Sequence, residues 1–208
     1  MLEVFIAHSH AADCNSSRSI LKVNYYVTGI VDHLDNLLQL IDSLMTMSEL
    51  DKATAINLSE TGLNDLLGMV VEQGHEQANG RALTIEMLAD ETLPTIEADK
   101  EKLSKVFSSI MSNAIHYTPD HGRIVVRAYE KNDGVVIEIS DNGIGMSEEV
   151  QADIFKRFYR ADDAHTTSGF GLGLSIAQRI IELHHGRIEV ESAPEQGSTF
   201  RVILPHPA

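Results

Sequence analysis

The sequence predicts an α+β fold, built as a two-layer α/β sandwich in which helices cover one face of a mostly antiparallel sheet. Stretches whose apolar residues recur with helical spacing alternate with short stretches in which apolar and polar residues alternate. Several of the short stretches come in pairs separated by turn residues, as in β-hairpins. Together they indicate a set of short strands and amphipathic helices, preceded by one long helix.

The long helix is expected over residues 19–49. Apolar residues recur there every seven positions, as a and d positions held for almost four heptads, at Ile20, Val27, Leu34 and Ile41 and at Val23, Ile30, Leu37 and Leu44. Such a repeat favours a coiled-coil or four-helix-bundle face over a helix packed on its own domain. We therefore expect a homodimer formed through this helix, and a division into a dimerisation region, 1–55, and a second domain, 56–208.

The second domain carries the sandwich. Helices with one apolar face are expected to start at Asn57 and to cover 99–116, 147–158 and 171–184. Strands are expected at 81–88, 93–97, 124–129, 135–140, 187–192 and 198–204.

Composition excludes several classes of function. The formal charge of −15 argues against nucleic acid and against direct contact with anionic membranes. A single cysteine, Cys14, precludes an internal disulfide and suits the cytoplasm. No apolar run approaches the ~20 residues that span a bilayer. His8/His10 and His184/His185 lack convincing ligand spacing with cysteines or carboxylates, so no structural metal is expected.

Two glycine-rich clusters flank the polar run 160–168. The first, Asp141-Asn-Gly-Ile-Gly-Met146, follows a predicted strand, and the second, Gly169-Phe-Gly-Leu-Gly-Leu174, precedes a predicted helix. Glycine lets a ligand approach the backbone, and a helix N-terminus attracts anions. The Asp141 carboxylate could accept a hydrogen bond from an exocyclic amine such as that of adenine. The pair predicts a pocket with a lid, whereas each cluster alone is compatible with a tight turn or an Asx-turn.

Three polar residues cluster at the end of the predicted helix 99–116. The carboxamide of Asn113 could bind Mg²⁺, or it could satisfy a buried backbone group. His116 could face a phosphate or only solvent. Tyr117 could line a sugar or base, or cover the end of the helix.

Five stretches, in order, resemble the N box, the first glycine box, the F box, the second glycine box and the final glycine box of sensor histidine kinases. They are Ser109-Ile-Met-Ser-Asn-Ala-Ile-His-Tyr-Thr-Pro119, Asp141-Asn-Gly-Ile-Gly145, Ile154-Phe-Lys-Arg-Phe-Tyr-Arg160, Gly169-Phe-Gly-Leu-Gly-Leu174 and Gly197-Ser-Thr-Phe200. Their order is similar to that of the Bergerat-type ATP-binding fold of the GHKL superfamily, over roughly residues 57–205. Residues 37–50 are similar to the second helix of the kinase dimerisation domain.

The resemblance implies a site for ATP and Mg²⁺. Asn113 would be the catalytic residue that coordinates Mg²⁺ on the triphosphate, and Asp141 would recognise the adenine amine. Gly143 and Gly145 would form the floor of the base pocket, and Tyr117 would lie against the nucleotide.

The second glycine box and the F box would serve the phosphates. Gly169, Gly171 and Gly173 would hinge the lid and offer backbone N–H groups. Arg157 and Arg160 would reach a phosphate, with a solvated role as the alternative. The implied nucleotide contacts are completed by His116, Leu172, Leu174 and Thr199.

The chain departs from the family pattern at three places. Ser109 stands where a second Asn is common, and His116 stands where Lys or Arg is usual. A neutral imidazole is a weaker phosphate partner than a permanent cation, so nucleotide affinity should fall above pH 7 by about 1 kcal/mol. The phosphoacceptor motif His-Glu-x-x-Thr-Pro does not occur.

The missing motif leaves two interpretations of function. In the preferred one, the chain is the ATP-binding catalytic region of a two-component kinase that starts after the phosphoacceptor. It would serve a response regulator receiver domain and would not phosphorylate itself. The alternative is a degenerate, non-phosphorylating dimeric scaffold or nucleotide sensor.

Overall fold

The computed structural model describes residues 30–31, 34, 37–53, 56–90, 93–131, 134–161 and 170–205. The chain divides after residue 42 into two units, and each is taken by itself. Much of the helix predicted over 19–49 lies outside the described residues, but residues 37–52 are helical. In the first unit six of the described apolar side chains are 48–63% exposed, Ile30, Val31, Leu34, Leu37, Leu38 and Ile41, whereas Leu40 is partly buried. Within the described ranges, no helix combines the length and apolar character needed to cross a bilayer.

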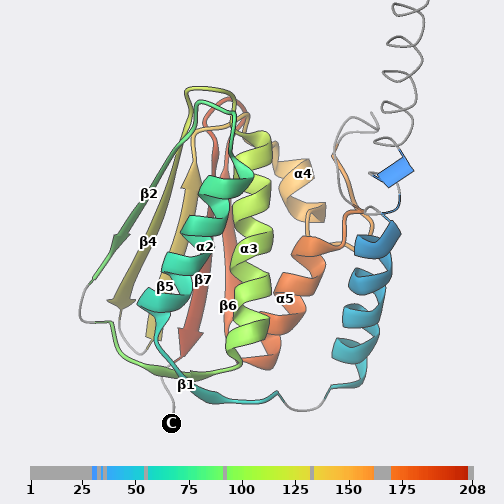
Figure 1. Ribbon diagram of the computed structural model, residues 1–208, viewed down its shortest axis with the longest axis vertical. Helices are drawn as coiled ribbons and strands as arrows, with labels where there is room; N and C mark the ends of the chain where they lie inside the picture. The colour runs from blue at the N-terminus through green and yellow to red at the C-terminus, as the bar shows by residue number, and fades with distance from the viewer. Residues whose placement is uncertain are drawn as a thin grey trace, which may run out of the picture. The chain divides into compact units, whose positions relative to one another are not determined.

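The second unit contains a five-stranded mixed sheet (Figure 1). In spatial order its strands are β2 (Thr84–Ala89), β4 (Arg123–Lys131), β5 (Gly134–Asp141), β7 (Ser198–Pro205) and β6 (Arg187–Ser192). Strands β2 and β4 run parallel and all other neighbours run antiparallel. The parallel pair is possible because the helix α3 (Lys100–Tyr117) crosses over between the two strands.

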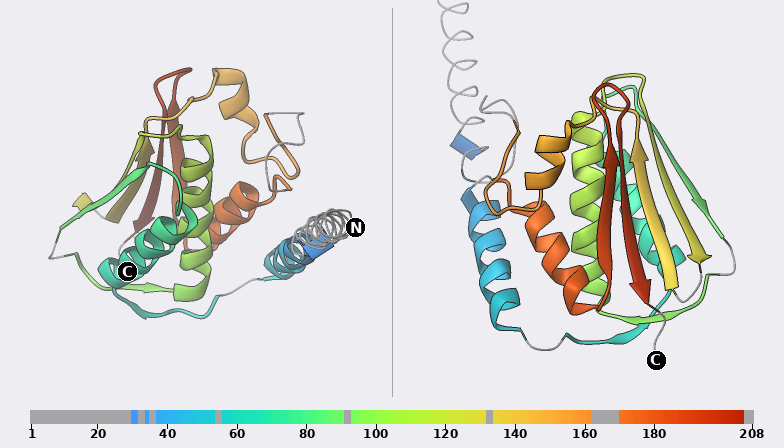
Figure 2. Two further views of the ribbon diagram at one scale, coloured as in Figure 1. Left: turned by 45° about the horizontal axis from the view of Figure 1, so that its top comes forward. Right: turned by 180° about the vertical axis from the view of Figure 1, so that it is seen from behind.

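Three helices cover one face of this sheet (Figures 1 and 2). They are α2 (Leu63–Gln77), α3 and α5 (Gly173–Leu183), and α3 contacts both of the others. Apolar side chains of the helices and of the inner sheet face are almost fully buried, among them Leu66, Phe107, Ile110, Ile124, Ile137, Ile139, Ile180 and Val202. Burying each such side chain stabilises the folded state by about 1.5–3 kcal/mol relative to leaving it exposed. The predicted α+β sandwich is therefore confirmed.

The prediction of a helix starting at Asn57 is wrong. Residues Ser59–Thr61 form a strand, β1, which pairs antiparallel with β3 (Ile96–Ala98) apart from the main sheet. The hydroxyls of Ser59 and Thr61 both donate to the carbonyl of Ala98 on β3. Helix α2 then starts at Leu63.

The helix predicted over 147–158 is shorter than expected. It forms only α4 (Glu148–Asp153), where the Ser147 hydroxyl accepts a hydrogen bond from the N–H of Val150. Five positions later Phe158 has φ of 63°, outside the helical region. Its N–H donates to the carbonyl of Gly171 at 2.9 Å, so a bond to a distant segment replaces the helical one.

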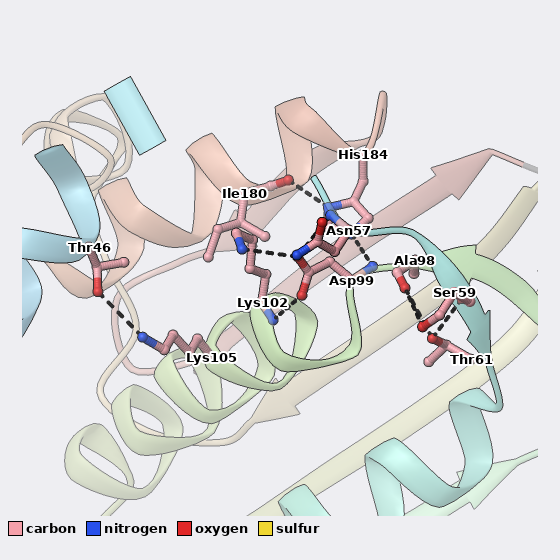
Figure 3. A network of polar contacts seen from close by, with 10 residues as sticks. All are labelled: Thr46, Asn57, Ser59, Thr61, Ala98, Asp99, Lys102, Lys105, Ile180 and His184. Carbon is pink, nitrogen blue, oxygen red and sulfur yellow. Dashed lines mark hydrogen bonds and ion pairs between the residues drawn. The ribbon is translucent and has the colours of Figure 1, made fainter. Parts of the chain in front are cut away.

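A polar network fixes the start of α3 to the end of α5 (Figure 3). The Asp99 carboxylate caps α3 by accepting from the Lys102 N–H at 3.1 Å and from Lys102 Nζ at 2.9 Å. The Asp99 N–H donates to Nε2 of the buried His184 at 3.0 Å. The other ring nitrogen, Nδ1, lies 2.8 Å from the Ile180 carbonyl, to which only a protonated Nδ1 can donate. His184 is therefore a neutral imidazole in the folded protein.

Candidate functional site

The C-terminal half of α3 places Asn113 at the candidate site. The apolar face of the helix, with Phe107, Ile110 and Ala114, is buried against the sheet and its neighbours. The Asn113 side chain is half-buried, and its carboxamide has no hydrogen-bond partner among the described residues. An open amide oxygen on a helix held rigid by its buried face is suited to bind a ligand.

The last turn of α3 carries the other two polar residues of the predicted site. His116 is exposed, and its ring stands edge-on to that of Tyr117 with centroids 4.8 Å apart. The carbonyl of Tyr117 accepts a hydrogen bond from the N–H of Ile144 at 3.2 Å. The first glycine cluster is therefore bonded directly to the end of α3.

Asp141 ends strand β5 and begins this cluster. Its Oδ1 accepts from the N–H of Gly143 at 2.8 Å and from the N–H of Ser198 at 3.3 Å. Burial raises the pKa of the Asp141 carboxyl, and these two bonds act in the opposite direction. No described residue donates to the second oxygen, Oδ2, which leaves an acceptor for an incoming donor.

Glycine is required at two positions of this cluster. A Cβ on Gly143 would collide with the carbonyl oxygen of Tyr117. Gly145 has φ of 65°, and a Cβ there would collide with the carbonyl oxygen of Ala193. The loop therefore lies closer to its surroundings than any side chain would allow.

The second glycine cluster meets α3 one turn before Asn113. Gly173 is the first residue of α5, and a Cβ on it would lie 2.5 Å from Oγ of Ser109. The N-cap, Leu172, is buried and provides no side-chain hydrogen bond to the first turn. Ser109 and Asn113 are four residues apart and share one face of α3. The α5 N-terminus, which favours anions, thus lies beside that face.

The remaining predicted residues have the following contacts and positions. Arg157 forms an ion pair with Asp51 at 2.7 Å. Thr199 donates to the hydroxyl of Ser140 at 3.0 Å, and the register places Ser198, not Thr199, opposite Asp141. Leu174 is half-buried next to Gly173, Arg160 follows Arg157 in the same segment, and Gly169 lies outside the described residues.

Two residues of the site were not predicted from the sequence. Ser198 holds the Asp141 carboxylate through its N–H, and its hydroxyl contacts that of Ser192 at 3.0 Å. The Asn142 side chain accepts from the N–H of Arg123 at 2.7 Å and fixes the start of the glycine loop. A signal for Asn142 existed, because Asn directly after a strand favours a local turn. The role of Ser198 depends on strand register, which the local pattern does not reveal.

Comparisons with known proteins identify the family and the fold of the chain. A family model described as histidine kinase-, DNA gyrase B-, and HSP90-like ATPase matches residues 98–208. The adaptive-response sensory kinase SasA of Synechocystis sp. is 35% identical over 173 residues, covering 83% of this chain and 45% of SasA. Full-length ShkA in complex with AMPPNP has a TM-score of 0.78 at 27% identity, covering 88% of this chain and 38% of ShkA. The nucleotide-free catalytic domain of histidine kinase ThkA has a TM-score of 0.65 at 27% identity. The match covers 72% of this chain and 96% of the ThkA domain.

The matched family region is more than half of the chain. The chain spans less than half of the length of SasA and of ShkA. The chain belongs to the family of histidine kinase-, DNA gyrase B- and HSP90-like ATPases, and it carries the ATP-binding catalytic region of a sensor histidine kinase.

Proposed function

We propose that this chain binds ATP with Mg²⁺ at the C-terminal half of α3 and donates the γ-phosphate to a histidine. One observation carries the proposal: α3 alone brings the three parts of the site together. It presents the carboxamide of Asn113, to which no described residue is hydrogen-bonded, it bonds the loop of Asp141 through Tyr117, and it meets the first residue of α5 at Ser109.

The adenine end of the site is assigned to Asp141. Its Oδ1 is already bonded to two backbone N–H groups, which fix the plane of the carboxylate. The other oxygen, Oδ2, to which no residue of the described ranges donates, can then accept from an exocyclic amine. The N–H bonds favour the ionised form, but they offset only part of the rise in pKa that burial causes. Guanine has a carbonyl oxygen at the corresponding ring position. That oxygen and the Asp141 carboxylate are both hydrogen-bond acceptors, so they could not bond to each other.

The phosphate end is assigned to Asn113 and the first turn of α5. Mg²⁺ prefers oxygen ligands and keeps several waters, so a single carboxamide oxygen that accepts no hydrogen bond from the described part of the chain fits it. When bound, Mg²⁺ supplies the positive charge that neutralises the transferring phosphate. The backbone N–H groups from Gly173 onward have no side-chain cap and can face the phosphate oxygens. Asn113 would hold its ligand in place, and phosphoryl transfer depends mainly on such positioning.

The acceptor histidine is proposed to lie outside these residues. No His-Glu-x-x-Thr-Pro motif occurs in the sequence. We therefore expect the chain to bind ATP without labelling itself, and to phosphorylate an added acceptor domain from a kinase of this family. A response regulator receiver domain would take the phosphate from that acceptor, and the proposed location is the cytoplasm, where ATP is available.

The N-terminal region is proposed to form a homodimer, with a boundary between residues 1–55 and 56–208. The support is the row of apolar side chains that stay 48–63% exposed at Ile30, Val31, Leu34, Leu37, Leu38 and Ile41. Apolar side chains repeated along one helix are best buried against a second helix.

Titration calorimetry with Mg·ATP tests the proposal. The unmodified chain should give heat that depends on Mg²⁺, and Asn113→Ala should lose that dependence. The matched control is Asn79→Ala, which removes the same side chain from an exposed turn. Absence of heat with the unmodified chain contradicts the proposed binding of Mg·ATP. Acid-labile label on this chain after incubation with labelled ATP contradicts the expectation that the chain does not label itself.

A further inference from the structure

Arg157 is engaged by the helical segment that precedes the catalytic region. Its Nη2 lies 2.7 Å from Oδ1 of Asp51, and the two side chains are 51% and 44% exposed. The hydrogen bond from Arg157 lowers the pKa of Asp51, with further attraction from Arg157 and Arg179. The guanidinium is therefore committed to a carboxylate 106 positions earlier in the chain.

The segment 43–52, which carries Asp51, is packed by other contacts as well. Leu50 and Met47 are 1% and 5% exposed, whereas Met45 on another side of the same segment is 59% exposed. Lys105 on α3 donates through Nζ to the hydroxyl of Thr46 at 3.3 Å (Figure 3). One side of the segment is therefore docked, with Asp51 at its polar edge.

The same arginine directly precedes Phe158, which is hydrogen-bonded to the second glycine cluster. Phe158, the following residue, donates its N–H to the carbonyl of Gly171 at 2.9 Å. Both residues have positive φ, 63° and 67°, and a Cβ on Gly171 would lie 2.5 Å from the carbonyl oxygen of Tyr159. A bulky residue in this conformation is strained and persists only where its surroundings hold it. Arg157 directly precedes this strained residue and is itself paired with Asp51.

We propose that the Asp51–Arg157 ion pair is a tether that docks residues 43–52 and holds the Phe158–Gly171 contact in the conformation that binds nucleotide. Arg157 then acts as a positioning residue and not as a phosphate ligand. Because coupling between two sites is reciprocal, nucleotide binding should stabilise the docked segment by the same factor by which docking favours nucleotide. This last step depends on the proposed binding of Mg·ATP, whereas the docking step does not.

The test uses the whole chain with D51N, R157Q, the double variant D51N/R157Q and the charge-reversed D51R/R157D. The controls are D120N and R187Q, which make the same charge changes in exposed pairs elsewhere, with Arg81 and Glu189. Hydrogen exchange of residues 43–52 is measured without nucleotide, and the Kd for Mg·AMPPNP is measured by calorimetry.

We expect D51N and R157Q each to speed exchange in residues 43–52 and to weaken nucleotide binding by about 1.5- to 5-fold, the range for an exposed pair. The double variant should be no worse than either single one, and the reversed pair should restore the original behaviour. High salt should remove the difference between D51N and the unmodified chain.

Two results would overturn the tether. If D51N tightens nucleotide binding while R157Q weakens it, Arg157 is a phosphate ligand that Asp51 restrains. If exchange in residues 43–52 is the same in every variant, the pair does not dock the segment. If the unmodified chain shows no nucleotide heat, the proposed function fails, and the exchange measurement alone still decides whether the tether exists.

Discussion

The buried His184 makes the stability of the fold depend on pH. Its Nδ1–H donates to the Ile180 carbonyl and its Nε2 accepts from the Asp99 N–H, so both nitrogens are satisfied only in the neutral ring. Protonation would place a second N–H against that of Asp99. Burial lowers the pKa of His184 from its ordinary value of 6.5, with the Ile180 carbonyl and Asp99 acting in the opposite direction and Lys102 and His185 reinforcing it.

The sign of the effect follows from this shift. Below pH 6.5 the unfolded chain takes up the proton before the folded chain does, so acid favours unfolding. The contribution of His184 to the free energy of unfolding should be complete above pH 6.5. It should fall as the pH drops toward the pKa that His184 has in the folded protein. One proton limits the slope to about 1.4 kcal/mol per pH unit. Burial raises the pKa of Asp99, but interactions led by the hydrogen bonds from Lys102 outweigh it and lower this pKa from 3.8. The stability that the Asp99 carboxylate contributes is therefore lost only at lower pH than the contribution of His184.

Urea unfolding followed by circular dichroism between pH 8 and 5 measures the effect. His184→Gln should cost about 1–3 kcal/mol at pH 8, because the geometry of both bonds is lost at buried groups. It should also lose part of the slope between pH 6.5 and 5, which isolates the contribution of this ring from the other histidines. His185→Gln changes an exposed neighbour whose contribution to the shift in the pKa of His184 is the smallest, so it should retain most of that slope. The reasoning is wrong if the His184 variant has the same slope as the unmodified chain.

Three further predictions concern the nucleotide site. Gly143→Ala forces a methyl group against the Tyr117 carbonyl and should cost about 1–3 kcal/mol in urea unfolding and weaken Mg·ATP binding. Gly68→Ala is its control, because a Cβ there meets nothing, and destabilisation by both would reject the steric argument. Asp141→Asn should weaken ATP binding by about 1.5–3 kcal/mol and reduce the preference for ATP over GTP in calorimetry, and unchanged selectivity would remove Asp141 from adenine recognition. His116→Lys should tighten Mg·ATP binding by up to about 1 kcal/mol, and an unchanged Kd would show that His116 does not face a phosphate.

Local patterns were enough to predict the parts of the site that are contiguous in sequence. Asp141 could be placed at the edge of a sheet because an alternating strand ends immediately before it. Gly143 and Gly145 follow at once, so their loop could be predicted to lie next to that carboxylate. Asn113 could be placed on the same helix as Tyr117, and the structure bonds Tyr117 to this loop.

Contacts between distant segments could not be predicted in the same way. Ser198 reaches Asp141 only because of the register between β5 and β7, and a shift of two residues would place another residue there. Residues Ser59–Thr61 have the composition of a helix cap, but they form a strand because β3 offers unpaired backbone groups beside them. Arg157 pairs with Asp51 across more than half of the chain, and no periodicity in either segment indicates it.

The length of α3 separates stability from binding. Its first turn is held by Asp99 and His184, and its last turn contacts the glycine loop through Tyr117. Eighteen residues at about 1.5 Å each place these two ends about 27 Å apart. Because the core face of the helix is buried along its whole length, a change at the first turn should lower the free energy of unfolding without moving Asn113. His184→Gln should therefore lower the midpoint of urea unfolding while the Kd for Mg·ATP stays the same at pH 8. A Kd that changes in step with stability would instead mean that α3 shifts as a unit and that the network at its start is part of the nucleotide site.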